Sequence, residues 1–258
     1  MKINFDDIND RESNKIALLL AHGPSLRNDL SRIFELSKNK KDFATFTTGE
    51  ASILENAGYF FDLDYWTIAN SVFTVQNNYM KINKHKNVTL LYAAAGVDGT
   101  KDPESLLTVD FLQFDQRHFN HQNCTKNFNL DISKLGTCCA NLPSEYFQKT
   151  KTIQEHLRDK CETKEIYSTA STSALHMLTT AILCGCKQIY LFGVDLDYSL
   201  GYVDNVTSNN DSFVPYITEI VNDFRIIDKA AKNIGCEIIN CSIRSPIAAV
   251  LKSKSFNL

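Results

Sequence analysis

One turn in this sequence has the residue types that bind an anion. The apolar run 16–21 predicts a buried strand, and the segment 22–26, which reads His-Gly-Pro-Ser-Leu, follows it directly. A strand that ends in a glycine-containing turn and opens a helix leaves unpaired N–H groups and the positive end of the helix dipole at one place. A phosphate binds readily there. The simpler alternative is that Gly23 and Pro24 only end the strand and that Ser25 caps the helix.

A carboxylate follows a second apolar segment. Residues 188–192 predict another buried strand, and Gly193 leads from this strand into Asp195. A carboxylate at the end of an apolar strand costs several kcal/mol if it is buried without a partner. Asp195 therefore requires either backbone N–H donors or a ligand hydroxyl, and we favour the ligand.

These residues need a scaffold that brings strand ends together. Short apolar runs alternate with helical patterns, which is typical of an α/β fold with an open, mostly parallel, Rossmann-like sheet and helices on both faces. The predicted strands are 16–21, 43–47, 65–69, 88–93, 188–192 and 237–240. The predicted helices are 26–39, 50–57, 72–83, 172–183 and 216–233. Right-handed crossovers place four residues that follow strands at the edge where such folds bind ligands: His22, Thr48, Asn70 and Asp195.

The length of 258 residues suits one core with a small lid, so we predict a single Rossmann-like domain over residues 1–258. The hydrophobic period is lost in residues 97–165, which we expect to form an insertion with local helices rather than further sheet. Residues 199–215 are rich in Asn, Ser and Asp. We expect them to form a flexible lid beside the ligand.

The composition excludes several classes of function. The net charge of −3 gives no general attraction to nucleic acid or to anionic lipid, so we predict no nucleic-acid partner. No secretory signal and no apolar stretch near the ~20 residues of a membrane span occur, which predicts a cytoplasmic protein without an integral membrane segment. The eight cysteines are expected to be reduced thiols. Their spacing does not match a zinc site, and we predict no metal.

Together, these motifs resemble the bacterial sialyltransferases of glycosyltransferase family 42 and, equally, the motility accessory factors, which include flagellin-modifying proteins. Four segments carry the resemblance. They are Gly23-Pro24-Ser25-Leu26, Ala69-Asn70-Ser71, the helix start Thr172-Ser173, and the motif Gly-x-Asp-Leu-x-Tyr at residues 193–198. The similarity extends over the sheet scaffold from residue 16 to about residue 245.

The resemblance implies an inverting, metal-independent glycosyltransferase that needs no cofactor. Its donor would be a CMP-activated nonulosonic acid such as sialic acid, and its acceptor a surface glycan or a protein. Relatives of this fold often form homo-oligomers, and the sequence leaves the oligomeric state of this chain open. The residues implied to bind the donor nucleotide are Gly23, Pro24, Ser25, Gly49, Asn70, Thr172, Ser173, Gly193 and Asp195.

Within this set, the resemblance implies that Gly23 and Ser25 lie against the phosphate and that Asp195 contacts the cytidine ribose. Tyr198 and Tyr202 correspond to phenol hydroxyls that stabilise the charge on the leaving phosphate. Simpler alternatives remain. Asn70 can be a turn residue, Thr172 and Ser173 can be helix caps, and the two tyrosines can pack within an ordered loop.

The sequence departs from the family at the donor site and in the lid. The helix start continues with Ala174 where the sialyltransferases prefer glycine, and the turn begins with His22 where they carry asparagine, which would change a contact to the donor. Residues 199–220 contain no histidine where their lid supplies the general base. The acceptor proton needs a group that can take it near neutral pH, and the candidates are His22, His118, His121 and Asp211. Two alternatives for the function remain: a hydroxymethylpterin pyrophosphokinase-like enzyme that needs ATP and Mg²⁺, and a non-catalytic nucleotide-sugar-binding protein.

Overall fold

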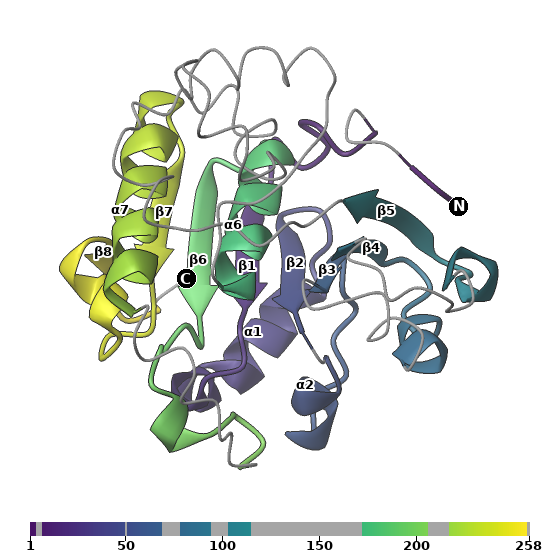
Figure 1. The fold of residues 1–258 in the computed structure, drawn as a ribbon, viewed down its shortest axis with the longest axis horizontal. Helices are drawn as coiled ribbons and strands as arrows, with labels where there is room; N and C mark the ends of the chain where they lie inside the picture. Colours follow the sequence, from purple (N-terminus) through teal and green to yellow (C-terminus); the bar gives the residue numbers. More distant parts are fainter. Residues whose placement is uncertain are drawn as a thin grey trace, which may run out of the picture.

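An eight-stranded sheet, parallel throughout, forms the centre of the protein (Figure 1). The computed structural model describes residues 1–3, 7–49, 51–68, 78–93, 103–114, 172–205 and 217–256. The strands are β1 (Ile16–Leu20), β2 (Phe43–Thr48), β3 (Tyr65–Ile68), β4 (Thr89–Ala93), β5 (Asp110–Phe114), β6 (Gln188–Phe192), β7 (Glu237–Asn240) and β8 (Lys252–Ser253). Their spatial order is β5-β4-β3-β2-β1-β6-β7-β8. The order therefore runs outwards from β1 in one direction and then restarts at β6 in the other.

Helices cover both faces of this sheet. The α-helices are α1 (Leu30–Ser37), α2 (Ser52–Asn56), α6 (Ser173–Leu183) and α7 (Ile217–Asn233). The 3₁₀ helices are η2 (Pro24–Asn28), η3 (Pro103–Leu106), η6 (Tyr198–Leu200) and η8 (Pro246–Ala249). Figure 1 shows α6 and α7 side by side in front of the sheet, with α1 behind it.

The two faces have separate cores because successive side chains of a strand point to opposite faces. Ala17 and Leu19 of β1 belong to a buried cluster with residues of α6 and α7. Leu18 and Leu20 belong to a second cluster with residues of α1 and α2. Four of the five residues of β1 are buried, as expected for a central parallel strand that is covered on both faces. The predicted fold class is thus confirmed.

The six predicted strands are present, and two further strands were not predicted. One of them, β5, lies within residues 97–165, so the expectation of no further sheet there is wrong. β5 reads Asp-Phe-Leu-Gln-Phe and is the last full strand on its side of the sheet, where Lys2 adds only a parallel bridge to Phe111. Its polar positions give it a weaker apolar pattern than the central strands. β8 has two residues and is too short to show any period.

The predicted helix 26–39 is two helices instead. The 3₁₀ helix η2 ends before Asp29, whose φ of −113° and ψ of −6° turn the chain, and α1 begins only at Leu30. The first turn therefore opens into five residues of 3₁₀ helix rather than into a long α-helix. The helix-dipole argument made for this turn loses most of its force, because the dipole grows with the number of aligned peptide units.

Several predictions concern residues outside the described ranges. These are Asn70, His118, His121 and Asp211, with most of the insertion 97–165 and the lid residues 206–215. The single-domain organisation stays a prediction. In the described part of the chain, no helix is long and apolar enough to cross a bilayer.

Candidate functional site

The candidate site lies where the strand order reverses. β1 pairs with β2 on one side and with β6 on the other, and Leu20 is in register with both Thr47 and Phe192. The three strands therefore end at the same level. In open α/β sheets, ligands bind outside the carboxyl ends of the strands at such a switch point. The prediction that His22, Thr48 and Asp195 lie at one edge is confirmed.

Two glycines allow the loops after β1 and β6 to touch. The Gly23 N–H donates to the Gly193 carbonyl at 2.9 Å. A Cβ at Gly23 would collide with the Asp195 carboxylate and would lie 2.5 Å from the Gly193 oxygen. Gly193 has a φ of +66°, and a Cβ there would lie 2.6 Å from the Ala21 oxygen. Both positions therefore need glycine for close backbone contact, independently of any ligand.

Asp195 binds the first turn directly. The Ser25 N–H donates to Asp195 Oδ2 at 2.8 Å, and the Ser25 hydroxyl donates to Asp195 Oδ1. Of the two kinds of partner predicted for Asp195, the structure thus supplies the N–H donor. A carboxylate has about four lone-pair sites, and Asp195 is only half-buried. The remaining lone pairs can accept from a ligand hydroxyl in addition to both bonds, and this contact stays a prediction.

This contact changes how the first turn can be used. The Ser25 N–H already has a carboxylate acceptor, so it is not an unpaired donor for a phosphate. Ser25 also does not cap η2, because the N-cap of that helix is Gly23, with Pro24 in its first turn. The simpler alternative for Ser25 is therefore wrong. Its hydroxyl joins Asp195 instead, and the proposed contact of the turn with a phosphate stays a prediction.

The backbone after Asp195 is strained. Leu196 has a φ of +54°, a left-handed conformation that costs a residue with a side chain about 1–2 kcal/mol. Its side chain is buried, with 8% exposed, and this burial offsets the cost. Strained residues persist where the surrounding structure fixes them, and they cluster at functional sites. The left-handed conformation of Leu196 turns the chain directly after Asp195.

His22 is a buried neutral ring. Its Nε2 lies 3.5 Å from the Thr47 hydroxyl, which donates to the Leu20 carbonyl at 3.1 Å. Burial lowers the pKa of His22 to about 4, against a smaller opposing effect of Asp204. A base with this pKa accepts a proton poorly near pH 7, because general bases work best with a pKa close to the operating pH. The environment of His22 therefore disfavours it as the general base.

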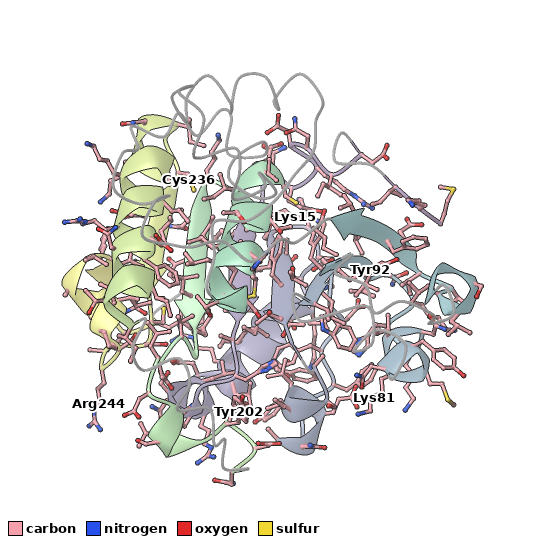
Figure 2. The ribbon with its side chains drawn as sticks, viewed as in Figure 1. Lys15, Lys81, Tyr92, Tyr202, Cys236 and Arg244 are labelled. Carbon is pink, nitrogen blue, oxygen red and sulfur yellow. The ribbon has the colours of Figure 1, made fainter. Side chains whose placement is uncertain are left out.

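The segment 202–205 crosses the first turn. The Val203 N–H donates to the His22 carbonyl at 2.8 Å. Arg27 donates from Nε to the Val203 carbonyl at 2.7 Å and from Nη2 to the Tyr202 carbonyl at 2.9 Å. The Tyr202 ring meets the His22 ring edge to face, with 6.4 Å between centroids. Figure 2 shows Tyr202 at the edge where the strands end, whereas Lys15 and Cys236 lie at the opposite edge.

The other predicted residues lie around this centre. The backbone of Tyr198 begins η6, in the loop that follows Asp195. Thr172 is the N-cap of α6, and its hydroxyl accepts from the Ala174 N–H at 3.4 Å, so the capping alternative is confirmed for Thr172. Ser173 is the first residue of that helix. Gly49 has a φ of +60°, and a Cβ there would lie 3.6 Å from the His22 ring.

Sequence reasoning missed two residues of the site. Ser242 lies beside Ser25, with 3.1 Å between the hydroxyl oxygens, and Arg27 holds the segment over the turn. A signal for Ser242 existed, because Ser242 follows the predicted strand 237–240 and therefore belongs to the same sheet edge. Among the described residues, no group of three or more His, Cys, Asp or Glu side chains is placed to hold a metal ion.

No family model matches the chain, and no curated protein is detectably similar to it in sequence. Several solved structures are similar to it. The sialyltransferase CstII from Campylobacter jejuni with CMP-3FNeuAc is 16% identical over 93% of this chain and 86% of that chain, with a TM-score of 0.46.

CST-II with a trisaccharide acceptor and CMP is 15% identical over 93% of this chain and 85% of that chain, with a TM-score of 0.45. Monomeric CstII is 15% identical over 95% of this chain and 89% of that chain, with a TM-score of 0.45. A likeness at this level is too coarse to give any residue of this chain a role. The resemblance to motility accessory factors stays a prediction.

Proposed function

We propose that the protein is a glycosyltransferase that binds a cytidine nucleotide at the carboxyl ends of β1 and β6. The observation that carries this proposal is the position of Asp195. It is a half-buried carboxylate at the switch point, and its partners there are the neutral N–H and hydroxyl of Ser25. An acidic residue at the end of a strand is a common ligand of ribose hydroxyls in nucleotide-binding α/β folds.

The proposed donor is a CMP-activated nonulosonic acid, and the acceptor is a hydroxyl of a surface glycan or a protein. The acceptor oxygen forms a bond to the anomeric carbon as the bond from that carbon to the phosphate oxygen breaks. CMP leaves, and the configuration is inverted. The acceptor proton passes to a base, for which His118, His121 and Asp211 are the remaining candidates. Tyr198 and Tyr202 are proposed to donate to the departing phosphate, without a metal.

A second candidate is a protein that binds the nucleotide sugar without turning it over. The low pKa of His22, about 4, favours this candidate, because the one candidate base in the described part of the site is weak at neutral pH. Release of CMP from a CMP-sugar in the presence of glycan or protein acceptors separates the two. Release identifies the transferase, and tight binding without release identifies the binding protein.

Ligand binding tests the proposal directly. Melting of the protein is compared with CMP, CMP-sialic acid, ATP with Mg²⁺, and no ligand. At 100 times its Kd, a ligand adds about 2.7 kcal/mol to the stability of a one-site protein. We expect the cytidine compounds to raise the melting temperature and EDTA to leave that effect unchanged. A shift with ATP and Mg²⁺ alone would refute the transferase and support the pyrophosphokinase alternative.

A matched pair of variants locates the nucleotide. Asp195→Asn removes the charge from the switch point, and we expect the CMP affinity measured by calorimetry to fall at least about tenfold, which corresponds to one lost hydrogen bond to a charged group. Asp197→Asn is the control. Asp197 is exposed and accepts from the Ser199 N–H at 3.1 Å, so its replacement should leave the affinity unchanged. Equal affinities of Asp195→Asn and the unmodified protein would show that Asp195 does not bind the nucleotide.

A further inference from the structure

Ser242 joins the tips of three strands in one hydrogen-bonded cluster. The Val194 N–H, after β6, donates to the Ser242 hydroxyl at 3.0 Å. The Ser242 and Ser25 hydroxyl oxygens lie 3.1 Å apart, and the Ser25 hydroxyl and N–H both contact Asp195. Ser242 itself follows β7 and has no exposed surface. We call Ser25, Asp195 and Ser242 the strand-tip cluster.

The direction of these bonds follows from the number of protons. Each serine has one hydroxyl proton to donate, and the shorter contact of Ser25 is the one with the charged Asp195 carboxylate. The proton between the two serines must then come from Ser242. Ser242 thus accepts from the Val194 amide and donates to Ser25, and Ser25 donates to Asp195. Every polar group in the chain of bonds is satisfied, which makes a buried network rigid.

Asn240 fixes Ser242 in turn. Asn240 Oδ1 accepts from the Ser242 N–H at 3.0 Å, and Asn240 Nδ2 donates to the Ser242 carbonyl at 3.1 Å. The same Nδ2 donates to the Ser253 hydroxyl of β8 at 3.0 Å. Asn240 is also completely buried. Asn240 therefore holds the backbone of Ser242 at both its N–H and its carbonyl, and it also binds β8.

We propose that Ser242 is a positioning residue for the nucleotide site, supported by Asn240, and that it acts through Ser25 on the orientation of the Asp195 carboxylate. This inference rests on the proposed function for one point, the identity of the ligand as a cytidine nucleotide. Ser242 has no exposed surface, so it acts on the ligand through Ser25 and Asp195. A carboxylate that is held in one orientation before binding loses less conformational freedom when the ligand binds. The strand-tip cluster therefore raises the affinity for a nucleoside whose hydroxyls donate hydrogen bonds to Asp195.

The first test uses the protein without ligand. Amide hydrogen exchange is measured by NMR at Ser25 and Val194 and is divided by exchange at Leu191, a core residue of β6, to remove global unfolding. Ser242→Ala should speed exchange at both amides about tenfold, the loss of one hydrogen bond. Ser245→Ala is the control. Its hydroxyl lies in the same loop and accepts from the Ile247 N–H at 3.4 Å, so neither amide should change.

Faster exchange at Val194 alone would overturn the proposal, because Ser242 would then satisfy a backbone amide without holding Asp195 against Ser25. Should Ser242→Ala not fold, Ser242→Cys gives the same comparison, with about threefold effects, because a thiol is a weak donor towards Ser25 and a weak acceptor for the Val194 N–H. Unchanged exchange at Ser25 in Ser242→Cys would be equally decisive against the proposal.

The second test is a double-mutant cycle in CMP affinity. We expect Ser242→Ala to weaken binding about fivefold in the unmodified chain and not at all in the Asp195→Asn background, because Ser242 acts only through Asp195. Equal losses in both backgrounds would overturn the proposal. If the unmodified chain binds no CMP, the proposed function fails, whereas the exchange at Ser25 still decides whether Ser242 positions Asp195.

Discussion

The two edges of the sheet each hold an acidic residue, and they use it differently. At the edge where the strands begin, Glu12 is 6% exposed, accepts from the Tyr65 hydroxyl at 2.9 Å and lies 2.7 Å from Lys15 Nζ. At the edge where the strands end, Asp195 is half-buried, and its partners are the N–H and hydroxyl of Ser25.

The difference lies in the charge of the partners. Lys15 neutralises the charge of Glu12, so this pair offers no net charge to a ligand. Ser25 supplies only neutral donors, so the charge of Asp195 is retained, and some of its lone pairs face away from Ser25. The carboxylate of Glu12 has a cationic partner, whereas the carboxylate of Asp195 has only neutral donors and keeps lone pairs for further hydrogen bonds. The location of a carboxylate is thus less informative than the charge of its partners.

The glycines at the two edges give the largest predicted contrast. Gly193→Ala introduces a side chain at a φ of +66° and places its Cβ 2.6 Å from the Ala21 oxygen. Left-handed strain of about 1–2 kcal/mol and overpacking of about 1–3 kcal/mol add to a loss near 3 kcal/mol in the free energy of unfolding. Denaturation in urea measures this loss.

Gly235→Ala at the opposite edge is the control. Gly235 has a φ of +73°, and no atom lies within 4 Å of a Cβ built there. Its replacement should cost only the strain, about 1 kcal/mol. Equal losses for the two variants would mean that the close contact of the loops after β1 and β6 contributes nothing to stability.

The strands of this fold were predictable because their signal is local. The central strands β1 and β6 are continuous apolar runs that are buried on both faces, and turns end them at Gly23 and Gly193. β5 was missed because two of its five residues, Asp110 and Gln113, are polar and interrupt the apolar run. The break at Asp29 was missed for a related reason, because the helical period of the segment 26–39 continues through the residue at which the backbone turns.

The site was predictable as a location and not as a set of bonds. The topology rules place His22 and Asp195 at one edge from the order of strands alone. They cannot show that Asp195 accepts a hydrogen bond from the Ser25 N–H, because that bond joins residues 170 positions apart. They also cannot give the pKa of His22, which depends on burial by several elements at once.

The charge difference between the edges predicts different consequences of removing each charge. Glu12→Gln leaves Lys15 without its acidic partner, and we expect a loss of about 2 kcal/mol. This is less than the loss for a completely buried pair, because 24% of the Lys15 side chain is exposed and can reach water. Asp195→Asn should change the free energy of unfolding by less than about 1 kcal/mol, since its partners are neutral and also bind water or an amide. Chemical denaturation at pH 7 measures both.

Ligand affinity must show the reverse order, with Glu12→Gln leaving CMP binding unchanged and Asp195→Asn weakening it. A large loss of stability in Asp195→Asn would place Asp195 in the same structural class as Glu12. The comparison between the edges would then fail, whatever the protein binds.

The smallest expected effect concerns pH and His22. Burial places the folded-state pKa of His22, about 4, below the ordinary value of 6.5, so between these values the unfolded chain binds a proton that the folded chain does not. The stability contributed by the neutral ring is complete above pH 6.5 and is lost as the pH falls towards 4. We expect about 1.8 kcal/mol of this loss between pH 7 and pH 5, measured by urea denaturation at both values.

His22→Asn should remove this part of the pH dependence. Some dependence should persist, because burial also lowers the pKa of His176, to about 3. The test therefore compares the change in the free energy of unfolding between pH 7 and pH 5 in the unmodified chain with the same change in the variant. An identical pH dependence would mean that His22 is protonated in the folded protein near its ordinary pKa. In that case a protonated His22 would lie at the same edge as Asp195. The contrast between Glu12, which has a cation beside it, and Asp195, which has only neutral donors, would then no longer hold.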